Sequence, residues 1–168
     1  MQLVTIDPKR YRKHLNKVIF ACIGALSIGS LSVSQLLIKL FPATDGSHFH
    51  WNLLGVIIAG ILVLSILIKQ KSKPFMYEVS YVWDLKQTLN KINRKMKKLE
   101  EASKTGDKVA LNILNFSYSG SRQLWLLDNN TITINHLSNL ENKLNTLAEQ
   151  HNVTLDVNLY DSSQLTEY

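Results

Sequence analysis

Two long apolar runs dominate the first half of the chain. Val18–Ile38 contains 21 residues without a charged side chain, and Trp51–Ile68 contains 18. As helices rising about 1.5 Å per residue they would extend roughly 31 and 27 Å, close to the ~30 Å hydrocarbon core of a bilayer. The pattern predicts two membrane-spanning helices, at about 18–40 and 51–68, joined by an outer loop over 41–50.

Two other interpretations of these runs are weaker. A hairpin of two buried soluble helices would need a larger surrounding protein than the 168 residues present. The basic start and the tripeptide Ser32-Val33-Ser34 resemble a cleaved signal peptide, but the apolar run continues through Leu36–Phe41. We therefore expect an uncleaved hairpin over 18–68.

Beyond Ile68 the chain has the mixed composition of a soluble protein. A long helix is predicted over 72–102, with Pro74 in the first turn, where a missing N–H costs nothing. Its apolar residues alternate three and four positions apart, at Val82, Leu85, Leu89, Ile92, Met96 and Leu99. This stripe covers fewer than three heptads and has no complementary charges beside it. It favours one helix of an intramolecular bundle, with dimerisation through the stripe as the alternative.

Two further helices are predicted downstream. Gly106 ends the long helix, and Asp107 can cap a second helix that runs to about Leu127. Thr133 can cap a third, which runs to about Gln150. The tail beyond it alternates apolar and polar residues but has no strong partner strand, so we expect an extended segment laid over the helices.

These elements together predict an all-α membrane protein, with a transmembrane helical hairpin followed by a small cytoplasmic three-helix bundle. The predicted domains are a basic cytoplasmic N-terminal segment over 1–17, the hairpin over 18–68 and a cytoplasmic helical domain over 72–168.

Charge sets the expected orientation of the hairpin. Residues 1–17 hold five Lys or Arg against one acid, and residues 69–104 hold ten against four. The loop over 41–50 has no Lys or Arg, and residues 105–168 hold three against seven acids. The positive-inside rule therefore predicts that both termini are cytoplasmic and that the short loop is outside.

The two basic belts are also candidate contacts for anionic lipid. Each Lys or Arg near such a surface gains about 1 kcal/mol, and aromatic rings suit the headgroup level. The candidate residues are Lys9, Arg10, Arg12, Lys13, Lys69, Lys71, Lys73, Tyr77, Tyr81 and Trp83. The alternative is that the cations only set topology.

Small residues recur every four positions in both predicted spans. Ala21, Ala25 and Gly29 share one face of the first span, and Gly55 and Ala59 share one face of the second. Because small residues let helix backbones approach closely, we expect these faces to pack the spans together, with homodimerisation as the alternative. The spans contain no Asp, Glu, Arg or His, so the usual residues of an ion or proton pathway are missing.

Tyr118, Arg122 and Trp125 share one face of the second soluble helix, because they are spaced i, i+4 and i+7. These residue types are enriched at binding hot spots, and Arg122 can lie over either ring. They form the candidate partner-binding face. The competing interpretation places Trp125 in the core and pairs Arg122 with an acid such as Asp128.

The sequence has little that suggests catalysis. It has none of the Walker, GxGxxG, GxSxG, CxxC or HExxH motifs, and Cys22 is its single cysteine. Asp45, His48 and His50 could ligate a metal, but a short loop lacks the fixed geometry, so we interpret them as solvated polar residues. We expect no enzymatic activity, cofactor, metal or small-molecule substrate.

Three stretches carry a resemblance to a known family. They are RYRKHLNKV before the first span, MYEVSYVWDLKQTLNKINRKMKKLE after the second, and ALNILNFSYSGSRQLWLLDNNTIT beyond. In this order they resemble an uncharacterised bacterial family of short two-pass inner-membrane proteins, catalogued only as a domain of unknown function. The resemblance covers essentially the whole chain and implies a bacterial inner-membrane location. It implies no activity, ligand or catalytic residue.

The sequence thus favours a membrane-tethered protein-interaction module, in which the hairpin anchors a cytoplasmic bundle that docks a partner protein or a second copy. One alternative is a membrane-surface module that responds to anionic lipid, and another is an accessory subunit of a membrane enzyme complex. Nucleic-acid binding is disfavoured, because the basic residues lie beside a membrane whose own phosphates account for them.

Overall fold

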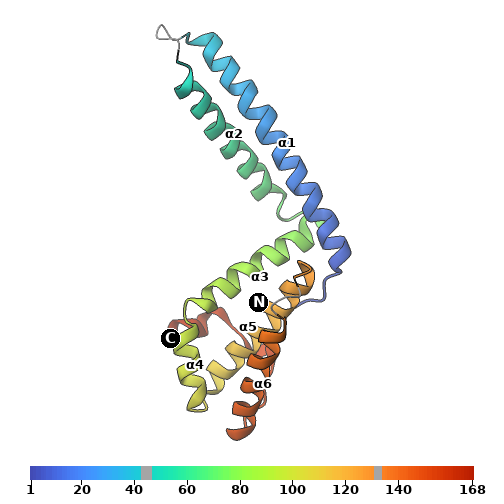
Figure 1. The fold of residues 1–168 in the computed structure, drawn as a ribbon, viewed down its shortest axis with the longest axis vertical. Coiled ribbons are helices and arrows are strands. Elements are labelled where there is room, and N and C mark those ends of the chain that lie inside the picture. Colours follow the sequence, from blue (N-terminus) through green and yellow to red (C-terminus); the bar gives the residue numbers. More distant parts are fainter. Residues whose placement is uncertain (43–46, 131–133) are drawn as a thin grey trace. The chain divides into compact units, whose positions relative to one another are not determined.

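The computed structural model describes residues 1–42, 47–130 and 134–168. Every regular element in these ranges is a helix, so the all-helical prediction is confirmed (Figure 1). The chain forms two compact units. The hairpin unit comprises residues 13–80, and the soluble unit comprises residues 1–12 together with 81–168.

The hairpin unit is built on α1 (Pro8–Leu40) and α2 (Phe49–Gln70). Both helices are long and apolar enough to cross a membrane. Their apolar side chains are largely bare, since Phe20 and Ile28 are each 71% exposed and Ile68 is 66% exposed. Leaving so much apolar surface in contact with water is unfavourable, so this unit needs an apolar environment around it.

The two hairpin helices touch through small residues. Gly55 is buried, and a Cβ added there would lie 2.1 Å from Ser34 Oγ and 2.9 Å from the backbone oxygen of Ser30. A Cβ added at Gly29 would lie 3.5 Å from the Cβ of Ala59, which is 2% exposed. Only a residue without a side chain permits this approach at position 55.

The predicted helix over 72–102 is wrong as a single element. A short 3-10 helix, η1 (Pro74–Met76), precedes α3 (Tyr77–Asn93), and α4 (Met96–Lys104) follows after a break. Lys95, at the break, has φ −109° and ψ 1°. Ile92 and Leu99, one on each side of the break, both join the buried core with no exposed surface. The turn changes the direction of the chain so that α4 also packs against the helix that follows it. The described part of residues 72–168 therefore contains four α-helices where the sequence predicted a three-helix bundle.

The central helix of the soluble unit is α5 (Lys108–Leu127), and α6 (Ile134–Gln150) packs against it. The predicted ends of α5 are confirmed. Asp107 accepts hydrogen bonds from the N–H groups of Val109 at 2.8 Å and Ala110 at 3.2 Å. Gly106, with φ +82°, ends α4 in a conformation that favours glycine. The predicted cap of α6, Thr133, lies outside the described residues.

The C-terminal tail packs over this core, as expected, but it is not simply extended. It contains two 3-10 helices, η2 (Val157–Leu159) and η3 (Ser162–Glu167). The ring of Tyr160 stacks on Phe116 with centroids 4.1 Å apart, and Leu165 is also buried.

The N-terminal residues also belong to the soluble unit. The Val4 N–H donates to the Tyr81 hydroxyl at 2.9 Å, and Gln123 Nε2 donates to the Val4 backbone oxygen at 2.5 Å. Ile6 and Tyr11 are 8% and 2% exposed. Residues 1–12 of the predicted basic N-terminal segment over 1–17 are therefore part of a packed unit.

Candidate functional site

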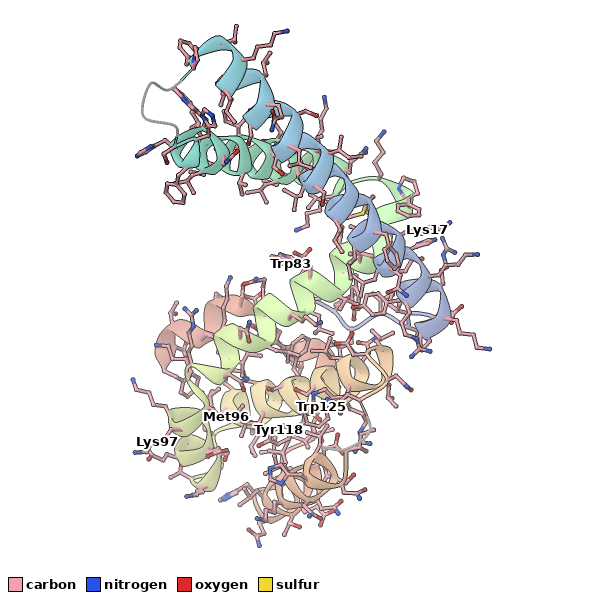
Figure 2. The ribbon with its side chains drawn as sticks, turned by 45° about the horizontal axis from the view of Figure 1, so that its top comes forward. Lys17, Trp83, Met96, Lys97, Tyr118 and Trp125 are labelled. Carbon is pink, nitrogen blue, oxygen red and sulfur yellow. The ribbon has the colours of Figure 1, made fainter. Side chains whose placement is uncertain are left out.

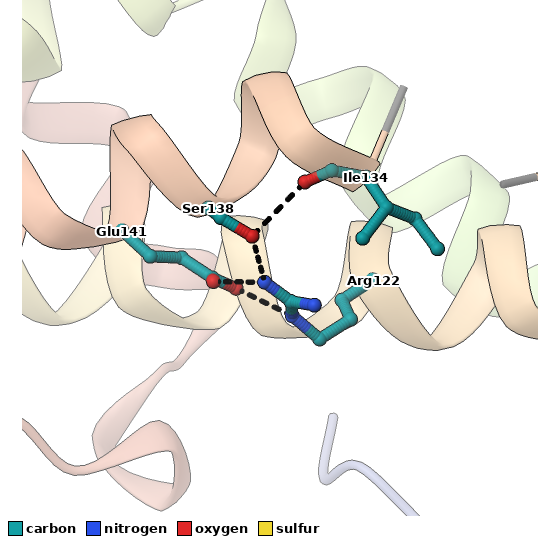
Figure 3. A network of polar contacts seen from close by, with 4 residues as sticks. All are labelled: Arg122, Ile134, Ser138 and Glu141. Carbon is teal, nitrogen blue, oxygen red and sulfur yellow. Dashed lines mark hydrogen bonds and ion pairs between the residues drawn. The ribbon is translucent and has the colours of Figure 1, made fainter. Parts of the chain in front are cut away.

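Arg122 lies in a polar network that joins α5 to α6 (Figure 3). Its Nε donates to Glu141 Oε1 at 3.0 Å, and its Nη2 forms an ion pair with Glu141 Oε2. The same Nη2 donates to Ser138 Oγ at 3.0 Å, and Ser138 in turn donates to the Ile134 backbone oxygen at 3.1 Å. The hydrogen bonding to Glu141 raises the pKa of Arg122. The guanidinium group of Arg122 therefore binds residues of the same chain.

The other two members of the predicted partner-binding face are also involved in packing. Tyr118 is 7% exposed, and its burial raises its pKa. Trp125 is partly buried against the core, and Figure 2 labels it on α5 with Tyr118. Arg122 does pair with an acid, as the competing interpretation had it, but that acid is Glu141 and not Asp128. The sequence could not choose between them, because the choice depends on how α6 packs.

Asp128 instead contacts side chains from distant parts of the sequence within the soluble unit. The Tyr11 hydroxyl donates to Asp128 Oδ1 at 3.1 Å, and Lys86 Nζ lies 3.0 Å from Asp128 Oδ2. Arg12 Nη1 donates to the backbone oxygen of Leu127 at 3.4 Å. A cation at the last carbonyls of α5 also suits the negative end of that helix. Sequence reasoning missed this cluster, and the only signal was an aromatic residue inside a basic segment.

The candidate lipid-contact residues fall into two groups. Most are exposed, namely Lys9, Arg10, Lys13, Lys69, Lys71, Lys73, Tyr77 and Trp83. Tyr77 and Trp83 are 52% and 59% exposed. Arg12 and Tyr81 are only partly exposed, and both form hydrogen bonds inside the soluble unit. The Tyr81 hydroxyl donates to Gln123 Oε1 at 2.9 Å.

Metal ligands do not cluster in the part of the chain that the structure describes, where no three His, Cys, Asp or Glu residues are placed to hold an ion. His48 and His50 are described there, and Asp45 lies outside the described residues. Phe41 and Trp51 stack at the loop end of the hairpin, with centroids 5.3 Å apart, where interfacial aromatic residues are expected.

Comparison with known proteins agrees with the family resemblance. The sequence model of one family, DUF3087, described as a protein of unknown function, matches residues 1–165. No curated protein and no solved structure matches the chain. Because the match spans nearly the whole sequence, the chain belongs to the DUF3087 family of proteins of unknown function.

Proposed function

We propose that this chain is a non-catalytic two-pass protein of a bacterial inner membrane, whose hairpin anchors a cytoplasmic helical domain that binds a partner protein. One observation carries the proposal. A hairpin with bare apolar side chains is joined to a soluble unit that has its own buried core. The hairpin needs a bilayer to cover its apolar side chains, whereas the soluble unit buries its own.

The orientation follows from the distribution of charge. Basic residues precede the first span and follow the second, whereas the loop between them has no Lys or Arg. An antiparallel hairpin brings both basic belts to one side, which the positive-inside rule makes the cytoplasmic side. The two parts of the soluble unit precede the first span and follow the second, and both are therefore cytoplasmic as well.

The docking surface that we favour lies on the outside of α3. The apolar stripe of this helix packs into the core, and Arg122 on α5 pairs with Glu141 of α6. Neither surface is therefore available to dock a partner. Trp83, Gln87, Asn90 and Lys91 are exposed and recur at helical spacing, and we call them the Trp83 surface. Figure 2 labels Trp83 on α3. An exposed Trp is uncommon on a soluble face and typical of hot spots. With Lys91 and the nearby Arg94 it suits a partner protein that presents an acidic patch.

Site-specific photocrosslinking in native membranes tests this proposal. A photoreactive amino acid at position 87 should crosslink one protein through a peptide rich in Asp and Glu. The same probe at Lys143, exposed on α6, serves as the control. Trp83→Ala and Lys91→Glu should each reduce the yield at position 87. Crosslinking to a second copy of the chain, or equal yields at both positions, would contradict the proposal.

A second candidate function is a response to anionic lipid. It is favoured by the exposure of Lys69, Lys71, Lys73 and Tyr77, which directly follow the second predicted span. Fluorescence quenching by brominated phosphatidylglycerol in nanodiscs discriminates between the protein-docking and the lipid functions. The protein measured is the full chain with Trp51→Phe and Trp125→Phe. Quenching of the remaining Trp83 places this residue in the bilayer interface and favours the lipid function. Unquenched fluorescence leaves the Trp83 surface free for a protein.

A further inference from the structure

A groove of about 580 Å³ lies in the hairpin unit between the first half of α1 and the last half of α2. Its volume is within the range of about 300–1,000 Å³ that is common for small-molecule sites. The groove exists because α1 and α2 approach closely around Gly29 and Gly55, and Ala21 and Ala25 do not continue that contact. These two alanines line the groove instead, opposite Val63 of α2.

The lining changes character along the groove. Ala21, Ala25 and Val63 give an apolar wall, whereas Lys17 and Lys73 line the groove together with Gln70. From Lys17 to Ala25 the helix rises about 12 Å, enough to accommodate the first part of an acyl chain. Figure 2 marks Lys17 on α1. An apolar wall with two cations at one end is the complement of an amphiphile with an anionic headgroup.

The basic end rests on packed side chains. Phe75 of η1 lines the groove, and its ring centroid lies 4.5 Å from that of His14. His14 Nδ1 lies 3.0 Å from Glu78 Oε2, and these two side chains are only 15% and 6% exposed. The segment that carries Lys73 is therefore held against α1 by the contact of His14 with Glu78, while Phe75 stays 43% exposed.

We infer that this groove binds one anionic phospholipid molecule. Its acyl chain lies against Ala21, Ala25 and Val63, and its phosphate lies between Lys17 and Lys73. A second hairpin is a poorer occupant, because neither span contains an acid to meet these lysines. The inference rests on the proposed membrane insertion, which makes such lipid available. It differs from binding at the bilayer surface, because it concerns one lipid held at one site.

Native mass spectrometry of the full chain, extracted from membranes in a mild detergent, tests the inference. The chain should retain one phosphatidylglycerol in preference to phosphatidylethanolamine. Ala25→Phe, which fills the groove, should lower the retained fraction by roughly tenfold, as expected when an acyl segment of a few buried CH₂ groups loses its site. Ser27→Phe is the matched control, since Ser27 is exposed on the same helix outside the groove and should retain lipid as the unmodified chain does.

The lysines have their own test in the same experiment. Lys17→Gln with Lys73→Gln should lower the preference for phosphatidylglycerol by roughly 25-fold, since each cation near anionic lipid contributes a factor of about five and the two factors multiply. Lys39→Gln, at the opposite end of α1, should leave the preference unchanged. Equal retention of the two lipids by the unmodified chain would overturn the inference. The inference would also be overturned if Ala25→Phe left lipid retention unchanged, or if this variant altered the fraction of dimer and not the retained lipid.

Failure of the groove and failure of the membrane proposal are separable. Extraction with alkaline carbonate releases peripheral proteins and leaves spanning proteins in the membrane. Release of the chain would overturn the proposed insertion and the groove with it. A chain that stays in the membrane but retains no phosphatidylglycerol would overturn the groove alone.

Discussion

The hydroxyl of Tyr11 and the carboxylate of Asp128, 117 positions apart in the chain, are joined by a hydrogen bond of 3.1 Å. Tyr11 is 2% exposed and lies in the first turns of α1, whereas Asp128 directly follows α5. The soluble unit therefore includes the start of the helix that contains the first predicted span. Residues 1–12 therefore pack as part of the soluble unit, whatever their basic side chains do for membrane topology.

Tyr11→Phe tests this contact. A hydrogen bond to a charged group contributes about 1.5–3 kcal/mol, and Lys86 still compensates the Asp128 charge, so we expect a loss of about 1–2 kcal/mol in the free energy of unfolding. Urea unfolding of the full chain in detergent, followed by intrinsic fluorescence, measures the loss. Tyr77→Phe, at a tyrosine that is 52% exposed, is the control and should change little.

Alkaline pH should destabilise the soluble unit. Burial, together with the negative charge of Asp128, raises the pKa of Tyr11 above its ordinary value of 10.0. Burial and the hydrogen bond to Asp107 raise the pKa of Tyr168 in the same way. A tyrosine whose pKa is raised by folding contributes stability that is complete below the unfolded pKa and is lost as the pH rises toward the folded pKa.

The free energy of unfolding should therefore decrease above about pH 10. Because Tyr11→Phe with Tyr168→Phe removes both groups, the double variant should lose less stability than the unmodified chain between about pH 9 and about pH 11. Unfolding curves collected across this range provide the measurement. The same slope in both proteins would show that these tyrosines do not control the alkaline response.

The pairing of Arg122 with Glu141 should appear as a coupling energy. Both side chains are partly exposed, at 34% and 26%, so we expect a coupling of about 1 kcal/mol in a double-mutant cycle with Arg122→Gln and Glu141→Gln. Urea unfolding of the four proteins gives the value. The exchange Arg122→Glu with Glu141→Arg should recover part of the lost stability, and a coupling near zero would argue against the network in Figure 3.

A disulfide should form between the two hairpin helices where Gly29 meets Ala59. A Cβ at position 29 lies 3.5 Å from that of Ala59, within the roughly 3.5–4.5 Å that a disulfide requires. In a Cys22→Ala background, Gly29→Cys with Ala59→Cys should oxidise to an intramolecular disulfide, detected by mass spectrometry. Gly24→Cys with Gly60→Cys is the control, because an added Cβ meets nothing within 4 Å at either glycine. Equal oxidation of both pairs would refute the α1–α2 contact.

The sequence predicted the features that local rules decide. Runs of apolar residues located both long helices, and the cap at Asp107 with the glycine at 106 located the start of α5 and the end of α4. Each of these features depends on neighbouring residues alone. Periodicity also identified the buried side of α3, since Val82 and Leu85 are 2% and 0% exposed.

Features that depend on tertiary packing were not predictable in this way. The break before α4 contains neither Pro nor Gly, and it follows from burying Ile92 and Leu99 against the same central helix. The choice of Glu141 over Asp128 as the partner of Arg122 depends on where α6 packs. In residues 1–12, four charged side chains obscured the few apolar side chains that enter the soluble unit.

The central claim is that the hairpin crosses the membrane and leaves the soluble unit in the cytoplasm. Labelling of introduced cysteines in spheroplasts, with a maleimide that cannot cross membranes and in a Cys22→Ala background, tests it most directly. Ser47→Cys, in the predicted outer loop, should react in intact spheroplasts, whereas Lys98→Cys, exposed on α4, should react only after lysis. Reaction of Lys98→Cys before lysis, or protection of Ser47→Cys until lysis, would contradict the account.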